Sequence, residues 1–171
     1  MGFFDKLLHS KVPESVAVQN APLTVCAPFS GTAMKMEDIP DPVFSQGVLG
    51  TGCGIDPAEE IVYAPFNGTV SQTTDTLHAI GVTSEDGIEL LIHVGMDTVE
   101  MAGKGFKCLV KKDQAVTAGQ PLMTFTLSDI QSAGHPPVTA VVVTNADDFA
   151  GVELLADGRV EHGAPLLRVT K

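Results

Sequence analysis

HAIGVTSEDGIELLIHVGMDTVEMAGKG, residues 78–105, is the stretch from which the organisation of this chain can be inferred. It holds two apolar runs, residues 80–82 and 88–92, separated by polar residues that end in Asp86-Gly87. An Asp-Gly pair between alternating hydrophobic runs is a strong β-hairpin signal. The stretch therefore predicts two antiparallel strands, with His78 where the first begins and His93 where the second ends.

The length of the turn decides whether the two histidines face each other. A four-residue loop over residues 84–87 sets His78 directly opposite His93, with Cβ atoms about 4.5–5.5 Å apart. A two-residue Asp86-Gly87 turn pairs His93 with Ile80 instead, so that the imidazoles lie diagonal to each other and not directly opposite. Facing imidazoles could act on a phosphoryl group, as nucleophile and hydrogen-bond donor, or hold a metal. The alternative is a pair of half-buried histidines satisfied by backbone groups.

Composition limits the class of protein. A chain of 171 residues fits one domain, and none of its apolar runs approaches the roughly 18 residues that span a bilayer. We see no signal peptide and expect a soluble, cytoplasmic protein. The net charge of −11 argues against nucleic acid and favours a basic protein partner.

The chain divides into a predicted flexible tail, residues 1–20, and one domain, residues 21–171. Apolar residues near the start share one face of a short helix, which Pro13 would end. Such a helix is too short to be stable alone, so the tail is either disordered or folds on a lipid surface.

From residue 23 onward the pattern is all-β. Short β-branched runs at residues 23–26, 68–70, 121–125, 138–144 and 165–169 alternate with turn residues. Helical turns are expected only at 128–133 and 146–150. We predict an antiparallel β-sandwich or barrel.

An internal repeat subdivides this domain. APFSGT at residues 27–32 recurs as APFNGT at 64–69, and residues 114–122 are echoed by 159–166. Two copies of one hybrid β-motif would explain both echoes. The repeated glycines, Gly31 and Gly68, would then serve a tight turn or a close backbone approach.

Several of these motifs together resemble a known family. HVGMDTVE at residues 93–100, GKGF at 103–106 and TLHA at 76–79 are similar to the phosphorylation-site signature of the glucose-type IIA component of the bacterial phosphoenolpyruvate:sugar phosphotransferase system. Residues 27–31, 39–45 and 64–69 resemble the same family, and the similarity runs from about residue 21 to 169.

The resemblance implies a phosphocarrier, that is, a phosphotransferase with a phosphohistidine intermediate. His93 would accept a phosphoryl group through Nε2 from the small protein HPr and pass it to a cysteine of the IIB domain of a sugar permease. His78 would stabilise the transferring group, and Thr76 would orient His78. From the residues alone, Thr76 could equally be a β-branched strand former.

The resemblance also implies a docking surface. Asp41 and Asp97 would flank the site, although Asp41 between two prolines could instead form an Asx turn. An apolar rim for partners would comprise Val43, Phe44, Val48 and Leu49, which could otherwise belong to the core. One departure is Gly50-Thr51-Gly52, where the family commonly has Gly-Asp-Gly. The family also docks regulated proteins and uses an N-terminal segment to reach its membrane partner.

Three competing functions remain. A zinc peptidase with a related β-motif needs a His-x-His pair, but His93 is followed by Val94-Gly95. A biotin or lipoyl carrier is suggested by Lys35 between two methionines, yet that lysine follows the Gly-Thr too soon. A purely regulatory binding module would use the same face. We expect no required cofactor; a zinc ion held by His78, His93 and a partner's carboxylate is the metal alternative.

Overall fold

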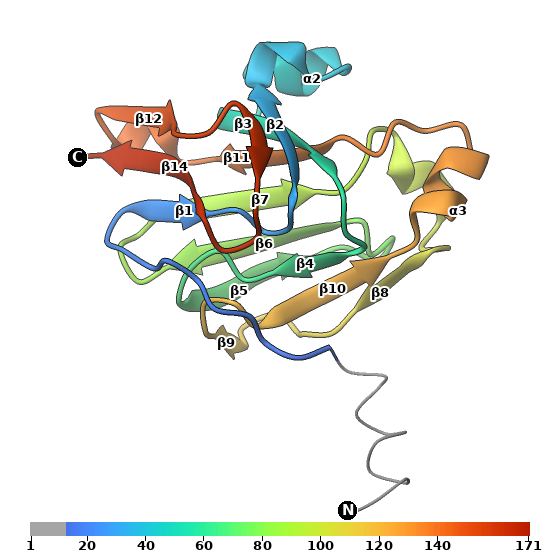
Figure 1. Cartoon of the computed structure of the whole chain (residues 1–171), viewed down its shortest axis with the longest axis horizontal. Helices are drawn as coiled ribbons and strands as arrows, with labels where there is room; N and C mark the ends of the chain where they lie inside the picture. The colour runs from blue at the N-terminus through green and yellow to red at the C-terminus, as the bar shows by residue number, and fades with distance from the viewer. Residues whose placement is uncertain (1–12) are drawn as a thin grey trace, which may run out of the picture.

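The computed structural model describes residues 13–171 and shows a β-sandwich with short helices (Figure 1). Its strands are β1 (Thr24–Cys26), β2 (Gly31–Lys35), β3 (Thr51–Pro57), β4 (Ile61–Tyr63), β5 (Gly68–Thr73), β6 (Ala79–Ser84), β7 (Glu89–His93), β8 (Phe106–Cys108), β9 (Ala115–Val116), β10 (Pro121–Phe125), β11 (Thr139–Val143), β12 (Gly151–Leu154), β13 (Gly158–Val160) and β14 (Pro165–Thr170). The helices are α2 (Pro42–Ser45) and α3 (Leu127–Ser132), with 3-10 turns η1 (Met36–Asp38), η2 (Thr98–Met101) and η3 (Ala146–Asp148).

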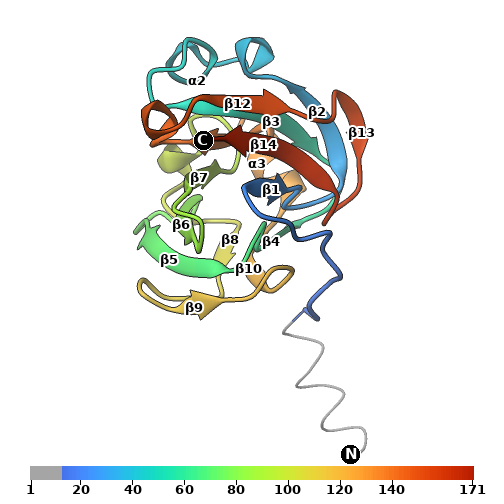
Figure 2. The ribbon, with the colours of Figure 1, turned by 90° about the vertical axis from the view of Figure 1, so that its left-hand side faces the viewer.

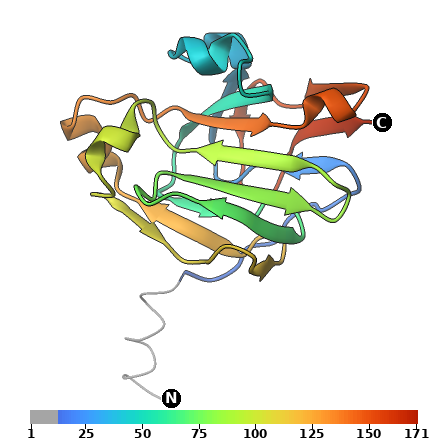
Figure 3. The same ribbon diagram turned by 180° about the vertical axis from the view of Figure 1, so that it is seen from behind.

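The strands form one large sheet and two small ones. The large sheet has the order β13-β2-β3-β11-β7-β6-β5-β9, and the small sheets are β1-β14-β12 and β4-β10-β8. Figure 3 shows the large sheet from behind, and Figure 2 shows the small sheets packed against it. All of the pairings described are antiparallel, which confirms the predicted fold class.

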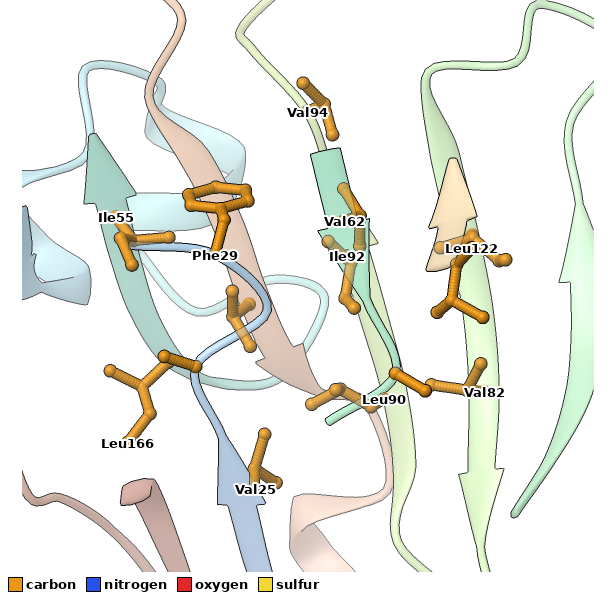
Figure 4. Packing of buried hydrophobic residues seen from close by; sticks show 14 of the residues in the cluster. Val25, Phe29, Ile55, Val62, Val82, Leu90, Ile92, Val94, Leu122 and Leu166 are labelled. Atoms are coloured by element: carbon orange, nitrogen blue, oxygen red, sulfur yellow. The ribbon is translucent and has the colours of Figure 1, made fainter. Parts of the chain in front are cut away.

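The core lies between these sheets. The inner face of the β6–β7 hairpin supplies Ile80, Val82, Leu90 and Ile92, which pack with side chains from the small sheets (Figure 4). Each fully buried aliphatic side chain contributes about 1.5–3 kcal/mol relative to exposure. Because β7 buries every second residue, this face fixes which of its residues point outward.

The predicted strands are confirmed to within a few residues, as are helical turns at α3 and η3. The helix α2 and the turns η1 and η2 were not predicted. Asp41 caps α2 by accepting a hydrogen bond from Val43 N (2.9 Å), and Pro42 occupies its first turn. A four-residue helix gives no periodicity to read, so only this Asp-Pro signal marks it.

Both predicted hairpin registers are wrong. His93 pairs with Ala79, a register between the two that we considered. The loop has three residues, because Ser84 N donates to Ile88 O (2.8 Å), and Gly87 adopts φ +90°. A three-residue loop with glycine in the left-handed region is the next most common hairpin connection.

The duplicated motif is visible in the hydrogen bonding. Cys26 N donates to Pro65 O (3.1 Å), and Tyr63 N donates to Pro28 O (2.8 Å). These two bonds are equivalent under the 37-residue offset of the repeat. The two copies therefore pair with each other through the same positions, as an approximate two-fold axis requires.

The second echo obeys the same symmetry. Gly163 N donates to Ala27 O (3.0 Å), and Gly119 N donates to Ala64 O (2.8 Å). Each Ala-Pro-Phe segment thus meets the glycine turn that precedes a Pro-Leu strand. The repeat is structural as well as sequential.

Residues 13–20, the described part of the predicted tail, contact the domain at both of these turns. Val16 N donates to Gly119 O (3.1 Å), and Gln19 N donates to Gly163 O (2.9 Å). Residues 1–12, for which we predicted a flexible tail that could contact lipid, lie outside the described residues. No helix within residues 13–171 is both long and apolar enough to cross a membrane.

The repeated glycines are required by close backbone approach. A Cβ on Gly68 would lie 2.0 Å from Thr83 O, and one on Gly31 would lie 2.2 Å from Asp56 O. We predict that Gly68→Ala lowers the free energy of unfolding by about 1–3 kcal/mol, because the backbone of β6 must shift.

Urea unfolding monitored by circular dichroism measures this change. Gly151→Ala is the matched control, because nothing lies within 4 Å of a Cβ there. The control should unfold within about 0.5 kcal/mol of wild type. Equal stability of the two variants would contradict the close-approach explanation.

Candidate phosphoryl-transfer site

Two imidazoles lie together where β6 begins and β7 ends. The ring centroids of His78 and His93 are 4.6 Å apart, and the rings meet edge to face at 82°. His78 is buried, with 6% of its surface exposed, and His93 is half-buried.

The pair forms despite the corrected register. His78 lies opposite Val94, so regular strands would direct the two histidines to opposite faces. Regular geometry ends at this point, because β6 starts after His78 and Leu77 has φ +62°. Val94 N still donates to His78 O (2.8 Å), which holds the two chain segments together. The irregular end of the hairpin brings the rings together.

A backbone carbonyl fixes the protonation of His93. Its Nδ1 lies 2.8 Å from Gly95 O. A carbonyl oxygen only accepts, so Nδ1 carries the proton and Nε2 has the free electron pair. Gly95 has φ +76°, and a Cβ there would lie 2.5 Å from Thr98 Cγ2. Glycine is therefore needed for this carbonyl to reach the ring.

Thr76 holds the second imidazole. Its Oγ1 lies 2.7 Å from His78 Nδ1. A hydroxyl can donate or accept, so the bond permits either tautomer. When the hydroxyl donates to Nδ1, the proton of His78 sits on Nε2 and can be given to an anion.

Both histidines are neutral at pH 7. Burial, followed by the neighbouring His93, lowers the pKa of His78 from its ordinary 6.5 to about 4. Burial also lowers the pKa of His93, while the Gly95 carbonyl and the carboxylates of Asp41 and Asp97 act in the opposite direction. His93 is thus a neutral nucleophile in surroundings that favour a developing positive charge.

The two predicted acidic residues lie beside this site. Asp41 combines two roles, since it caps α2 and its charge acts on His93. Asp97 has φ +59° and immediately precedes η2. The Asx-turn alternative for Asp41 is therefore compatible with a position next to His93.

The predicted apolar rim divides into two parts. Phe44 is buried, and its ring centroid lies 4.9 Å from that of His93. Val43, Val48 and Leu49 are exposed. Val99 in η2 is also exposed, by 52%, and was missed because it lies inside the signature motif. We call these four exposed side chains the apolar rim from here on.

A shared zinc ion can be tested against this geometry. His93 Nδ1 is engaged by Gly95 O, so only Nε2 could bind a metal. Within residues 13–171 no group of three or more His, Cys, Asp or Glu side chains is arranged to hold a metal ion. The pair could supply at most two ligands, and a partner would have to complete the site. The zinc alternative stays a prediction.

Comparison with known proteins supports one family. Residues 23–149 match the family described as phosphoenolpyruvate-dependent sugar phosphotransferase system, EIIA 1. The PTS system glucose-specific EIIA component of Staphylococcus aureus is 39% identical over 141 residues, 82% of this chain and 85% of the relative. The glucose permease IIA structure from Mycoplasma capricolum superposes with a TM-score of 0.78 at 31% identity, covering 89% of this chain and 98% of the other.

A larger relative contains the same unit as one part. The glucoside-specific EIICBA component of Staphylococcus carnosus is 43% identical over 145 residues, 85% of this chain but 21% of the relative. The fold and matches define a component of the phosphotransferase system. The chain belongs to the EIIA 1 family and, as an EIIA component, is a phosphocarrier.

The depressed pKa of His78 predicts a pH-dependent stability. In the unfolded chain His78 binds a proton as the pH falls through about 6.5, whereas in the folded protein its pKa is about 4. The contribution of His78 to the free energy of unfolding is therefore complete above pH 6.5, and it is lost as the pH falls from 6.5 towards 4. At about 1.4 kcal/mol per pKa unit, His78 accounts for a loss of roughly 3 kcal/mol.

Urea unfolding at pH 7 and pH 4.5 checks this expectation. His78→Asn should lose clearly less stability between these pH values than wild type does. An identical loss in both proteins would show that His78 titrates normally in the folded state.

Proposed function

We propose that His93 accepts a phosphoryl group on Nε2 from phospho-HPr and passes it to a cysteine of a IIB domain. The observation that carries this proposal is the Gly95 carbonyl on His93 Nδ1, which leaves Nε2 as the nucleophilic atom beside a second imidazole. Family membership supports the same chemistry.

The transfer balances without a cofactor. The Nε2 electron pair forms a bond to phosphorus while the bond between phosphorus and the donor histidine breaks. The proton stays on Nδ1, so the phosphorylated ring carries a positive charge. Gly95 O and the carboxylates of Asp41 and Asp97 stabilise that charge. In the second step a thiolate attacks the phosphorus, and His93 leaves as a neutral imidazole.

His78 would stabilise the moving group. Phosphoryl transfer depends mainly on positioning and on neutralising the equatorial oxygens. With Thr76 donating to Nδ1, His78 offers an Nε2 proton to a phosphoryl oxygen. Its depressed pKa keeps the ring neutral, so this hydrogen bond comes without a full positive charge that would hold the group back.

The partners would dock on the apolar rim. Val43 directly precedes Phe44, whose ring packs against that of His93, and the chain carries a net charge of −11. A basic protein face with an apolar centre fits such a surface. Regulated proteins would use the same face, and the tail would assist at the membrane. Docking to HPr and to a IIB domain would place the protein in the cytoplasm.

Phosphorylation by enzyme I, HPr and phosphoenolpyruvate tests the roles of the histidines. His93→Gln should take up no acid-labile phosphate by intact mass, because the nucleophile is absent. His78→Gln should still be phosphorylated but should fail to pass the group to a IIB domain.

His162→Gln is the matched control for this experiment. Its Nδ1 is also held, by Glu59 Oε1 at 2.8 Å, which leaves Nε2 free as in His93. The control should label like wild type. Labelling of His93→Gln at the wild-type level would overturn the proposal.

The docking surface can be tested separately. Val48, at 67% exposure, is the most exposed residue of the apolar rim. Val48→Glu should raise the KM for phospho-HPr about tenfold, corresponding to roughly 1.4 kcal/mol, with little change in kcat.

Ala115→Glu adds the same charge on β9, at the other edge of the large sheet, and should leave the KM unchanged. Both variants should keep the thermal stability of wild type. Equal KM values for the two variants would exclude Val48 from the docking surface.

A further inference from the structure

A buried threonine, Thr98, holds the turn that carries the Gly95 carbonyl. Thr98, the first residue of η2, is completely buried. Its Oγ1 donates a 2.6 Å hydrogen bond to Val94 O. This bond closes the turn from Val94 to Thr98 on its inner side.

The methyl group of Thr98 packs on the same turn. Cγ2 occupies the space beside Gly95, where a Cβ on that glycine would approach it to 2.5 Å. From the other side, Met96 N donates to Pro136 O (2.9 Å). The Gly95 peptide is thus confined between the Thr98 side chain and the segment before β11.

Val94 connects this turn to both histidines. Its N–H bonds to His78 O, and its carbonyl accepts from Thr98 Oγ1. The next carbonyl along the chain is that of Gly95, which fixes His93 Nδ1. A change at Val94 O would rotate the following peptide and move that carbonyl relative to the ring.

We propose that Thr98 is a positioning residue for phosphoryl transfer: its hydroxyl sets the Gly95 carbonyl that keeps the proton of His93 on Nδ1. The inference rests on the proposed function of His93. A purely structural threonine would fill the same space, but its hydroxyl would have no effect on the tautomer of the His93 ring.

Thr98→Val tests this role, because it removes the hydroxyl at nearly constant volume. We expect a larger fraction of the tautomer with the proton on Nε2, measured from the ¹⁵N shifts of the His93 ring. The pKa of His93 should fall further, since the Gly95 bond raises it. The kcat for uptake from phospho-HPr should drop about tenfold to a hundredfold, with an unchanged KM.

Two further variants separate the hydroxyl from general packing. Thr98→Ser keeps the hydroxyl and should retain the wild-type tautomer and a kcat within about threefold of wild type. Thr24 in β1 is buried, and its hydroxyl donates to Pro22 O (3.1 Å). Thr24→Val therefore loses a comparable bond away from the site. That control should leave the His93 ring and the kcat unchanged. If Thr98→Val does not fold, Thr98→Ala takes the same readouts.

The results distinguish a failure of the proposed function from a failure of the role proposed for Thr98. If wild type takes up no phosphate, the proposed function fails. If wild type is phosphorylated but the hydroxyl-free variant has the wild-type tautomer, pKa and kcat, the role of Thr98 is wrong. A loss of kcat with an unchanged tautomer, or an equal loss in Thr98→Ser, would also overturn it.

Discussion

The pairing of Ala79 with His93 is the constraint from which the site follows. The inner face of this hairpin buries Ile80, Val82, Leu90 and Ile92, so a slip of either strand by one residue would turn its two buried side chains to the other face. The core therefore fixes which side of the sheet His93 faces. On that outer side the ring of His93 packs against Phe44 of α2. Phe44 belongs to a second, smaller hydrophobic cluster that includes Met96 and Val142. The nucleophile is placed by hydrophobic burial on the opposite face of its own strand.

Neutrality is the second consequence of this placement. An imidazole that carried a charge before the reaction would lack the electron pair that attacks phosphorus. Burial keeps both rings neutral, and two adjacent rings could not both be charged without repulsion. The Gly95 carbonyl, Asp41 and Asp97 become most favourable only once His93 is phosphorylated and positive. The surroundings thus match the intermediate better than the resting state, which is how differential stabilisation assists a reaction.

Much of this arrangement could be predicted from local sequence signals. The Asp-Gly turn indicated the hairpin, and the period of two indicated its buried face. The register could not be predicted, because Gly87 serves loops of several lengths and the sequence does not select among them. The contact between the histidines then depends on the positive φ of Leu77, a conformation that the preferences of leucine do not predict. Thr98 and Phe44 were not recognised in their observed roles because these arise from contacts between separate segments.

The duplication shows what the scaffold contributes and what it does not. Ser30 Oγ accepts from His162 N (2.9 Å), and Asn67 Oδ1 accepts from Ala118 N (2.8 Å), at equivalent positions of the two copies. The frame is therefore nearly symmetric, down to side chains that tie each repeat to its glycine turn. The histidine pair breaks this symmetry, since it lies in the hairpin that follows only the second copy. A rigid duplicated frame can hold the ends of β6 and β7 still, while the few residues after each strand end set the chemistry.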